Sequence, residues 1–303
     1  MSEAGGPDAR CGFVAIVGAP NAGKSTLLNL FVGSKVSIVT PKVQTTRFRV
    51  RGISIHGETQ IIFVDTPGIF APKRRLERAM VDAAWSGARD ADIVVVLVDA
   101  RRGVDADTGR IVEGLKAGGR KAVLALNKID LVQRADLLPL SARLDASGLF
   151  TDTFMVSALT GDGVDDLRDH LAARLPPGPW LYPEDQIADM PLRLLAAEVT
   201  REKLFLRLYQ ELPYALTVET ESWAERDDGS VRIDQVIHVL RKAHKPIVLG
   251  KGGRQIKAVG SAARGELQVL LERRVHLFLH VKVAPKWLDD PDHYRDLGLE
   301  FPR

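Results

Sequence analysis

The sequence Gly18-Ala-Pro-Asn-Ala-Gly-Lys-Ser25 decides the fold of the first half of the chain. It matches the pattern G-x-x-x-x-G-K-[ST], follows the apolar run 13–18 and opens a helical pattern over 24–32. A glycine-rich turn between a strand and a helix lets backbone N–H groups approach a phosphate, and the helix N-terminus adds the positive end of its dipole. The stretch therefore predicts a phosphate-binding loop made of Gly18, Ala19, Pro20, Asn21, Ala22, Gly23, Lys24, Ser25 and Thr26.

Apolar runs alternate with helical patterns up to about residue 175. The runs are 13–18, 47–55, 60–65, 92–99, 121–127 and 153–157, and the helical patterns are 24–32, 75–89, 107–117, 135–147 and 164–174. Several runs are continuously apolar, which is typical of strands buried on both faces of a parallel sheet. The alternation predicts a doubly wound α/β P-loop domain with a mostly parallel six-stranded sheet. Such sheets bind ligands beyond the carboxyl ends of their strands.

A proline-rich stretch over 176–189 predicts a stiff linker between two domains. A nucleotide-binding domain is expected over 10–175 and a second domain over 190–303, with a disordered leader over 1–9. The second domain combines helical patterns (190–208 and 255–273) with strand patterns (214–223, 231–240 and 275–283). The first two strands are expected to form a hairpin, so the class of this domain is α+β.

The composition predicts a soluble protein of a reducing compartment. The chain has 303 residues, 45% of them hydrophobic, which is enough for two ordinary cores. Cys11 is the only cysteine, so it excludes an intrachain disulfide, and we expect it to pack as a small hydrophobe. The longest apolar run, 93–98, is far shorter than the roughly 20 residues that span a bilayer. A cytoplasmic location is expected, and peripheral contact with the inner face of the membrane stays open.

The phosphate loop alone leaves an ATPase, a GTPase and a small-molecule kinase as alternatives. Asn127-Lys128-Ile129-Asp130 follows the run 121–127, where a ligand-binding loop belongs. The Asp130 carboxylate can accept hydrogen bonds from N1–H and the exocyclic amine of guanine. Adenine lacks this donor pair, so an unpaired Asp130 would disfavour it by a few kcal/mol. The sequence therefore favours GTP and GDP as ligands and argues against the kinase.

Two further motifs are expected to complete the nucleotide site. Asp65-Thr66-Pro67-Gly68 ends the run 60–65, where Asp65 can hold Mg²⁺ through water and the Gly68 N–H can sense the γ-phosphate. In the phosphate loop, Lys24 is expected to reach the β- and γ-phosphates and the Ser25 hydroxyl to bind Mg²⁺. Ser157-Ala158-Leu159 ends the run 153–157 and is expected to close over the base with backbone N–H groups.

A second site is predicted near the C-terminus. Gly250-Lys251-Gly252-Gly253 precedes a helical pattern, and a G-x-x-G turn that opens a helix is the backbone clamp of a KH domain, which grips about four nucleotides of single-stranded RNA. The formal net charge of the chain is only +3, yet residues 241–286 contain eleven Lys or Arg and two Glu. This basic stretch is the electrostatic footprint of a polyanion. The expected RNA contacts are Gly250, Lys251, Gly252, Gly253, Arg254, Lys257 and Arg264.

Together the motifs resemble the Era-like family of translation-factor-related GTPases, which carry a C-terminal KH domain. The resemblance rests on GAPNAGKST (18–26), QTTR (44–47), DTPG (65–68), NKID (127–130), SAL (157–159) and VLGKGGRQIKAVGSAAR (248–264), so it covers nearly the whole chain. It implies a GTPase that binds the single-stranded 3′ end of small-subunit ribosomal RNA and assists assembly of the 30S ribosomal subunit. A monomer is expected.

The resemblance also implies roles for single residues. Thr46, in the first switch loop, would bind Mg²⁺ when GTP is bound, with Thr45 as the alternative that the sequence leaves open. Lys24, Thr46 and Gly68 would then be the catalytic residues. Asn21 matches a position that helps to bind K⁺ in related GTPases, although an Asn there can equally serve only to shape the loop.

Ile69 follows the DTPG motif where Ras-like GTPases carry a Gln that orients the attacking water. An aliphatic side chain cannot orient water by hydrogen bonding, so intrinsic turnover is expected at or below the order of 10⁻² s⁻¹. Two hypotheses follow for the working step. Either the protein is a GTPase that serves as a timer for RNA assembly, or GTP binding alone switches RNA affinity and hydrolysis is incidental.

Overall fold

The computed structural model describes residues 6 and 8–302. The chain divides into two compact units. The first comprises the described residues up to Ser37, Thr46–Asp189 and the residues from Leu297 onward, and the second comprises Ile38–Thr45 and Met190–Asp296. Most of the predicted leader, residues 1–5 and 7, lies outside the described residues. Within the described part of the chain, no helix is both long and apolar enough to cross a membrane.

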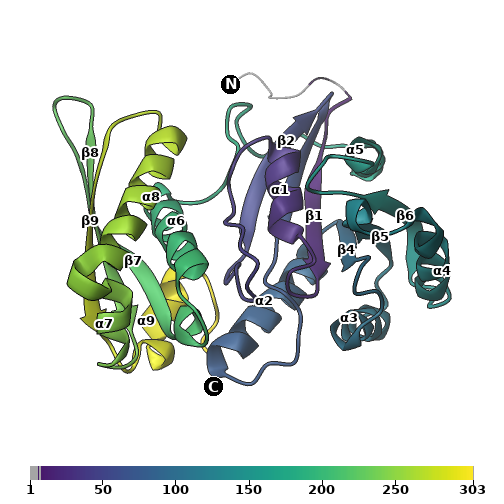
Figure 1. The fold of residues 1–303 in the computed structure, drawn as a ribbon. Coiled ribbons are helices and arrows are strands. Elements are labelled where there is room, and N and C mark those ends of the chain that lie inside the picture. Colours follow the sequence, from purple (N-terminus) through teal and green to yellow (C-terminus); the bar gives the residue numbers. More distant parts are fainter. Residues whose placement is uncertain (1–5, 7, 303) are drawn as a thin grey trace. The chain divides into compact units, whose positions relative to one another are not determined.

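The first unit is built on a six-stranded sheet with the order β2-β3-β1-β4-β5-β6 (Figure 1). Its strands are β1 (Arg10–Gly18), β2 (Val50–His56), β3 (Thr59–Asp65), β4 (Ile93–Asp99), β5 (Ala122–Asn127) and β6 (Phe150–Val156). Only β2 runs antiparallel to its neighbour, and the other pairs are parallel. The predicted mostly parallel six-stranded sheet is therefore confirmed.

Helices cover both faces of this sheet, which explains why its central strands are apolar throughout. The helices are α1 (Lys24–Val32), α2 (Arg75–Asp90), α3 (Ala106–Ala117), α4 (Arg134–Asp145) and α5 (Val164–Arg174). One core joins the sheet to α2, α3 and α4, with Ala84, Ile111 and Leu144 packed on strand residues such as Val96 and Leu124. Helices α1 and α5 both pack against β2 and β3. Burial on two faces leaves the strand ends as the free edge for ligands.

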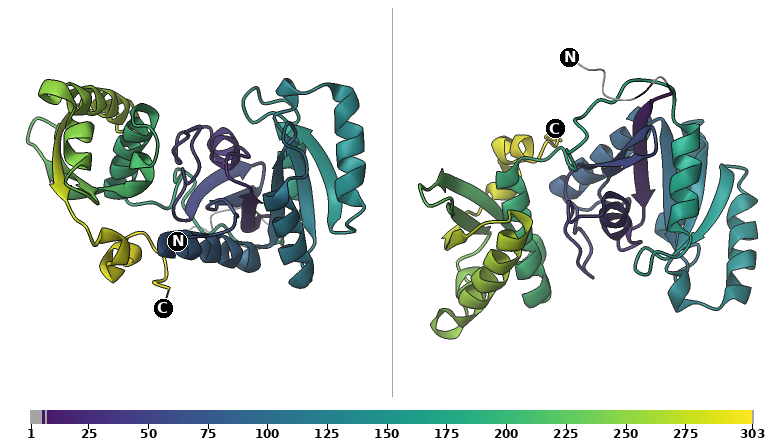
Figure 2. Two further views of the ribbon diagram at one scale, coloured as in Figure 1. Left: turned by 60° about the horizontal axis from the view of Figure 1, so that its bottom comes forward. Right: turned by 90° about the horizontal axis from the view of Figure 1, so that it is seen from above.

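The second unit is an α+β domain with the three-stranded sheet β7-β8-β9. Its strands are β7 (Leu216–Glu225), β8 (Val231–Val239) and β9 (Val275–Val283), and its helices are α6 (Leu192–Arg207), α7 (His244–Leu249), α8 (Arg254–Leu270) and α9 (Pro291–Asp296). Strands β7 and β8 form the predicted antiparallel hairpin, and β9 pairs parallel to β8. Helices α6 and α8 lie side by side on one face of the sheet (Figures 1 and 2).

Element boundaries differ from the sequence prediction in several places, for different physical reasons. Strand β2 begins at Val50 rather than at residue 47, because Val50 pairs with Asp65, the last residue of β3. Helix α8 ends at Leu270 rather than at residue 273, and Glu272 adopts a positive φ of 51° that a helix cannot continue. The short helix α7 was not predicted, because Pro246 inside it interrupts the helical pattern.

The proline-rich stretch 176–189 lies along the first unit. Gln60 fixes it at the centre, since its Nε2 donates to the Tyr182 carbonyl (2.8 Å) and its Oε1 accepts from the Leu181 N–H (2.8 Å). Ile53 N–H donates to the Ile187 carbonyl (2.9 Å), and Arg51 pairs with Asp189 (2.8 Å). The prolines keep the stretch extended, and these bonds hold it against β2 and β3.

Candidate nucleotide-binding and RNA-binding sites

The parallel register brings the ends of five strands to one edge of the sheet. Gly18, Asp65 and Asn127 are the last residues of β1, β3 and β5. Asn127 pairs in register with Asp99, which ends β4, and with Val156 of β6, so Ser157 lies one residue further on. The four nucleotide motifs therefore meet at the carboxyl edge, where doubly wound sheets bind ligands.

Two glycines of the phosphate loop are required by close backbone packing. Gly23 has a φ of 104°, and a Cβ atom on it would lie 2.2 Å from Nδ2 of Asn127. A Cβ atom on Gly18 would lie 2.5 Å from the Leu97 carbonyl oxygen. Asn21 also has a positive φ, 64°, a conformation that Asn adopts more readily than most residues. The loop therefore presents backbone rather than side chains.

Lys24 is buried beneath this loop, with 6% of its surface exposed. Its Nζ donates to the carbonyl oxygens of Gly18 (3.2 Å) and Ala19 (3.1 Å). Burial lowers the pKa of Lys24 to about 8, while the nearby Asp65 carboxylate opposes that shift. At neutral pH the ammonium keeps its charge, and its hydrogen bonds to the two carbonyl oxygens fix its position beneath the loop.

Two of the predicted metal ligands, Ser25 and Thr46, converge on one oxygen of the third, Asp65. Oδ2 of Asp65 accepts from Ser25 Oγ (2.7 Å), Thr46 Oγ1 (3.1 Å) and Ser37 Oγ (3.0 Å), and Ser25 Oγ lies 2.9 Å from Thr46 Oγ1. Asp65 is fully buried, and burial raises the pKa of this carboxyl. Its other oxygen, Oδ1, has no partner among the described residues. A buried carboxylate surrounded by hydroxyl oxygens fits Mg²⁺, which prefers hard oxygen ligands.

The two threonines that the sequence could not distinguish lie in different surroundings. Thr46 Oγ1 faces Ser25 and Asp65. Thr45 Oγ1 instead hydrogen-bonds to Thr40 Oγ1 (2.7 Å) and to the Lys42 carbonyl (2.7 Å). The geometry therefore favours Thr46 over Thr45 as the residue at the metal site. Ser37 was missed by the sequence analysis because it stands in no recognisable motif.

The NKID motif holds the two sides of the base site together. Asn127 is buried, and its Nδ2 donates to the Ala22 carbonyl (2.7 Å) while its Oδ1 accepts from the Ala158 N–H (2.9 Å). Asp130 is exposed, and its Oδ1 accepts from Ser157 Oγ (2.6 Å). The amide of Asn127 thus links the phosphate loop to the loop after β6, and Asp130 offers a carboxylate beside them. Leu159 is 78% exposed, so its side chain takes no part in this packing.

Lys128 forms an ion pair with Asp99, a residue that the sequence motifs did not identify. Lys128 Nζ donates to the Asn21 carbonyl (2.6 Å) and to Asp99 Oδ2 (2.6 Å). Burial alone would raise the pKa of Asp99, but hydrogen bonds from Arg101 and Lys128 together lower it. The register pairing of Asp99 with Asn127 is the signal that could have identified this residue.

The DTPG turn packs directly on the phosphate loop. Thr66 Oγ1 donates to the Ile16 carbonyl (2.9 Å), and the Ile69 N–H donates to the Gly18 carbonyl (3.1 Å). A Cβ atom on Gly68 would lie 3.0 Å from Pro20. The side chain of Ile69 is fully buried in the core of the sheet. This position therefore contributes packing to the domain and offers no polar group to a water.

The G-x-x-G turn lies between α7 and α8. Gly250, Gly252 and Gly253 have positive φ angles of 72°, 61° and 74°. A Cβ atom on Gly250 would lie 2.6 Å from Cβ of Gln255, whereas Gly252 faces open space. Lys251 and Gly252 are exposed at the tip. The turn thus offers bare backbone at the N-terminus of a helix, which suits a phosphate.

Basic side chains follow the turn along α8. Arg254, Lys257 and Arg264 are exposed and recur at helical spacing, opposite the buried Val259 and Ala263. Among the described residues, none of these three has an ion-pair partner. Arg273 and Lys282, further along the basic stretch, are instead paired with Glu225 and Glu221 (2.6 Å for Lys282). The turn is therefore followed by three basic side chains that no carboxylate of the described residues neutralises.

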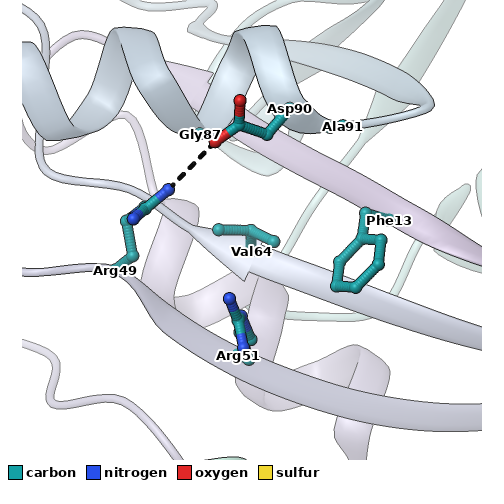
Figure 3. A pocket seen from close by; sticks show the side chains of 7 residues that line it. All are labelled: Phe13, Arg49, Arg51, Val64, Gly87, Asp90 and Ala91. Carbon is teal, nitrogen blue, oxygen red and sulfur yellow. Dashed lines mark hydrogen bonds and ion pairs between the residues drawn. The ribbon is translucent and has the colours of Figure 1, made fainter. Parts of the chain in front are cut away.

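A separate cavity of about 120 Å³ lies over β1, β2 and β3 next to α2 (Figure 3). Its lining residues are Phe13, Arg49, Arg51, Val64, Gly87, Asp90 and Ala91. Both arginines are already neutralised, Arg49 by Asp90 (3.4 Å) and Arg51 by Asp189 (2.8 Å). No residue of the predicted nucleotide or RNA motifs lines this cavity.

The fold and these sites define a class, a P-loop GTPase domain followed by a KH domain. Family models agree, since residues 13–128 match the family described as 50S ribosome-binding GTPase and residues 211–288 match the KH domain. The chain is 60% identical over 302 residues to GTPase Era of Rhizobium meliloti, covering 100% of this chain and 96% of the relative. It is 59% identical to GTPase Era of Brucella suis, covering 97% and 94%. The chain belongs to the Era family of GTPases, and it is a GTPase.

Solved structures give the same result for the whole architecture. A variant of Era from Aquifex aeolicus bound to GDP·AlF₄⁻ matches with a TM-score of 0.91 and 40% identity, covering 95% of this chain and 99% of that one. A structure of Era in complex with MgGDPNP and nucleotides 1506–1542 of 16S ribosomal RNA also matches with a TM-score of 0.91 and 40% identity, covering 96% and 99%.

Proposed function

We propose that this GTPase binds the single-stranded 3′ end of small-subunit ribosomal RNA through its KH domain and assists assembly of the 30S subunit. The observation that supports this most strongly is the similarity, over nearly the whole chain, to Era bound to MgGDPNP and a 16S ribosomal RNA segment. The positive-φ glycines at 250–253 and the unpaired basic face of α8 supply the clamp and the charge that such a ligand needs.

We assign the roles in hydrolysis as follows. Lys24 and the Gly68 N–H would stabilise negative charge that develops on the γ-phosphate. Ser25, Thr46 and Asp65 would hold Mg²⁺, whose charge would offset that of the phosphates. Asp130 recognises guanine. Because Ile69 is buried in the core and orients no water, intrinsic turnover should be slow.

RNA binding by the full-length chain tests this proposal. A single-stranded RNA with the sequence of the small-subunit 3′ end should bind more tightly than a scrambled RNA of equal length and composition, at the same salt concentration. Single-turnover hydrolysis with and without that RNA separates the two hypotheses for the working step. If hydrolysis is incidental, RNA will change nucleotide affinity but not the rate. Equal binding of both RNAs would contradict the proposed target.

Ser25→Ala is expected to raise the Mg²⁺ concentration for half-maximal hydrolysis by about tenfold or more, because it removes a metal ligand and a hydroxyl that orients Asp65. The measurement is the hydrolysis rate over a Mg²⁺ series at saturating GTP. Ser54→Ala is a matched control, since Ser54 is half-buried in the same unit and its Oγ bonds, within the described part of the chain, only to the Phe31 carbonyl (2.9 Å). An unchanged Mg²⁺ dependence in Ser25→Ala would remove this residue from the metal site.

Replacing Na⁺ by K⁺ at constant ionic strength is expected to raise turnover by about tenfold, equivalent to about 1.4 kcal/mol of transition-state stabilisation. We assign this effect to a K⁺ ion held with the help of Asn21. Asn21→Gly should abolish the difference between the ions while preserving the loop, because Gly adopts the φ of 64° freely. A rate that does not depend on the ion in the wild type would leave Asn21 with the role of shaping the loop.

We also propose the domain boundaries 10–175, 176–189 and 190–303, a monomeric state and a cytoplasmic location. Peripheral contact with the inner face of the membrane stays a prediction of the sequence.

A further inference from the structure

Ser37 places a third hydroxyl on the buried carboxylate of Asp65, although it belongs to none of the nucleotide motifs. Its Oγ donates to Oδ2 of Asp65 (3.0 Å), the oxygen that also accepts from Ser25 and Thr46. All four residues belong to the first compact unit. Ser37 is only 3% exposed, and a buried hydroxyl costs free energy unless it is hydrogen-bonded. The carboxylate of Asp65 supplies that bond.

The three hydroxyls differ in what else they contact. Ser25 Oγ and Thr46 Oγ1 lie 2.9 Å apart, so these two groups can bond to each other as well as to the carboxylate. Both are also proposed ligands of Mg²⁺. Within the described part of the chain, the side chain of Ser37 has a single hydrogen-bond partner, Oδ2 of Asp65. The hydroxyl of Ser37 therefore serves the carboxylate alone.

Asn29 fixes the backbone of Ser37 at both of its polar groups. Oδ1 of Asn29 accepts from the N–H groups of Val36 and Ser37, at 2.9 Å each. Nδ2 of Asn29 donates to the Ser37 carbonyl (2.7 Å). One side-chain amide thus satisfies three backbone groups of a segment that lies outside any helix or strand. These bonds keep Ser37 within hydrogen-bond reach of Asp65.

Asn29 and Asp65 stand on two elements that are packed together. Asn29 follows Ser25 by four residues on α1, so the two side chains lie on the same face of this helix. Phe31 of α1 stacks on Phe63 of β3, with ring centroids 4.2 Å apart and planes 3° apart. Both phenylalanines are buried. The core of this unit therefore sets the position of Asn29 relative to Asp65.

We propose that Ser37, held by Asn29, is a positioning residue for Mg²⁺ binding. Its bond to Oδ2 keeps the carboxylate of Asp65 in one orientation and leaves Oδ1 for the metal and the waters bound to it. Oδ1 is buried and has no partner among the described residues, which fits this role. Loss of a hydrogen-bonding partner of a ligating group typically weakens metal binding by about 10- to 100-fold. The inference rests on the proposed roles of Ser25 and Asp65 at the metal site.

Ser37→Ala in the full-length chain tests the inference, with GDP affinity over a Mg²⁺ series as the readout. We expect the Mg²⁺ concentration that gives half of the effect on GDP affinity to rise about tenfold. GDP affinity in EDTA should stay at the wild-type value, because no metal is then bound. Ser141→Ala is the matched control, since Ser141 Oγ also donates to a carboxylate of the first unit, that of Asp145 (3.1 Å). It should keep the wild-type Mg²⁺ dependence.

A comparison of two nucleotides distinguishes positioning from direct ligation. Thr46 is proposed to bind the metal only when GTP is bound, so Thr46→Ala should change the Mg²⁺ dependence with a non-hydrolysable GTP analogue and not with GDP. Ser37→Ala should change the dependence by the same factor with both nucleotides, because Asp65 serves the metal in both states. A change with the GTP analogue alone would overturn the positioning role of Ser37.

A double-mutant cycle tests the contribution of Asn29. Asn29→Ala should raise the required Mg²⁺ concentration by itself and have no further effect once Ser37 is replaced by Ala. Additive effects would remove Asn29 from the proposal. Should Asn29→Ala not fold, Asn29→Asp keeps the acceptor for both N–H groups, loses the donor to the Ser37 carbonyl and should show a smaller change in the same direction.

Two results would overturn the inference as a whole. One is an unchanged Mg²⁺ dependence in Ser37→Ala, and the other is an equal loss of GDP affinity in EDTA, which a merely structural role would cause. Ser25→Ala, measured in the same way, shows which proposal has failed. If Ser25→Ala changes the Mg²⁺ dependence and Ser37→Ala does not, only the positioning role is wrong. If neither variant changes it, the proposed metal site is wrong as well.

Discussion

Asp130→Asn is expected to reverse the base preference of this GTPase from GTP towards xanthosine triphosphate. The carboxylate of Asp130 is exposed beside the phosphate loop, where it can accept two hydrogen bonds from guanine. Each hydrogen bond to a charged group contributes about 1.5–3 kcal/mol, so loss of the charged acceptor should weaken GTP binding by about a hundredfold. The new amide donates to the 2-oxo group of xanthine, so the ratio of the two affinities should change by about a thousandfold or more.

Competition between the two triphosphates for the full-length variant, in Mg²⁺, measures this ratio. Asp162→Asn is the matched control, because Asp162 is a carboxylate in the neighbouring loop and its Oδ2 accepts from Thr160 Oγ1 (2.9 Å). A variant that keeps the wild-type preference for GTP would place the base elsewhere. The bond from Ser157 to Asp130 Oδ1 survives this change, because Asn keeps an oxygen acceptor.

The parts of the fold that local chemistry decides could be predicted from the sequence. Helices α1 and α5 have the predicted bounds, and so does β9. The phosphate loop could be recognised because a strand, a glycine-rich turn and a helix start follow one another within a few residues. The mostly parallel sheet followed from apolar runs that alternate with helices. Its register then brought the motifs to one edge, as the rule for doubly wound sheets predicts.

The features that could not be predicted from the sequence depend on contacts between residues that lie far apart in the chain. The choice between Thr45 and Thr46 is made by the course of a loop that groups with residues more than 140 positions later. Arg201 stands in the run Glu198-Val-Thr-Arg-Glu-Lys203, which resembles a solvated helix face, yet it is 1% exposed and lies 5.0 Å from the centre of the Phe205 ring. The start of β2 was predicted three residues early because strand pairing, not local apolarity, sets it.

Replacing Lys251 and Gly252 together by Asp is expected to weaken RNA binding by about a hundredfold or more, since like charges brought together at an interface cost several kcal/mol. The change should leave the fold intact. Both residues are exposed, a Cβ atom on Gly252 meets nothing within 4 Å, and Asp tolerates the left-handed conformation that a φ of 61° requires. The loss should therefore come from carboxylates placed where RNA phosphates lie, and nucleotide affinity should stay at the wild-type value.

The matched control is Arg226→Asp with Gly229→Asp in the turn between β7 and β8, which makes the same change of charge at an exposed glycine of positive φ, 76°. It should bind RNA far better than the variant in the 250–253 turn. Lys257→Ala distinguishes the contribution of one basic side chain from that of the glycine turn. One phosphate contact contributes about one unit to the slope of log affinity against log salt concentration. RNA affinity across a salt series measures all three variants. Wild-type affinity in the Lys251 and Gly252 variant would exclude the turn as the clamp, and the basic face of α8 would then be solvated surface.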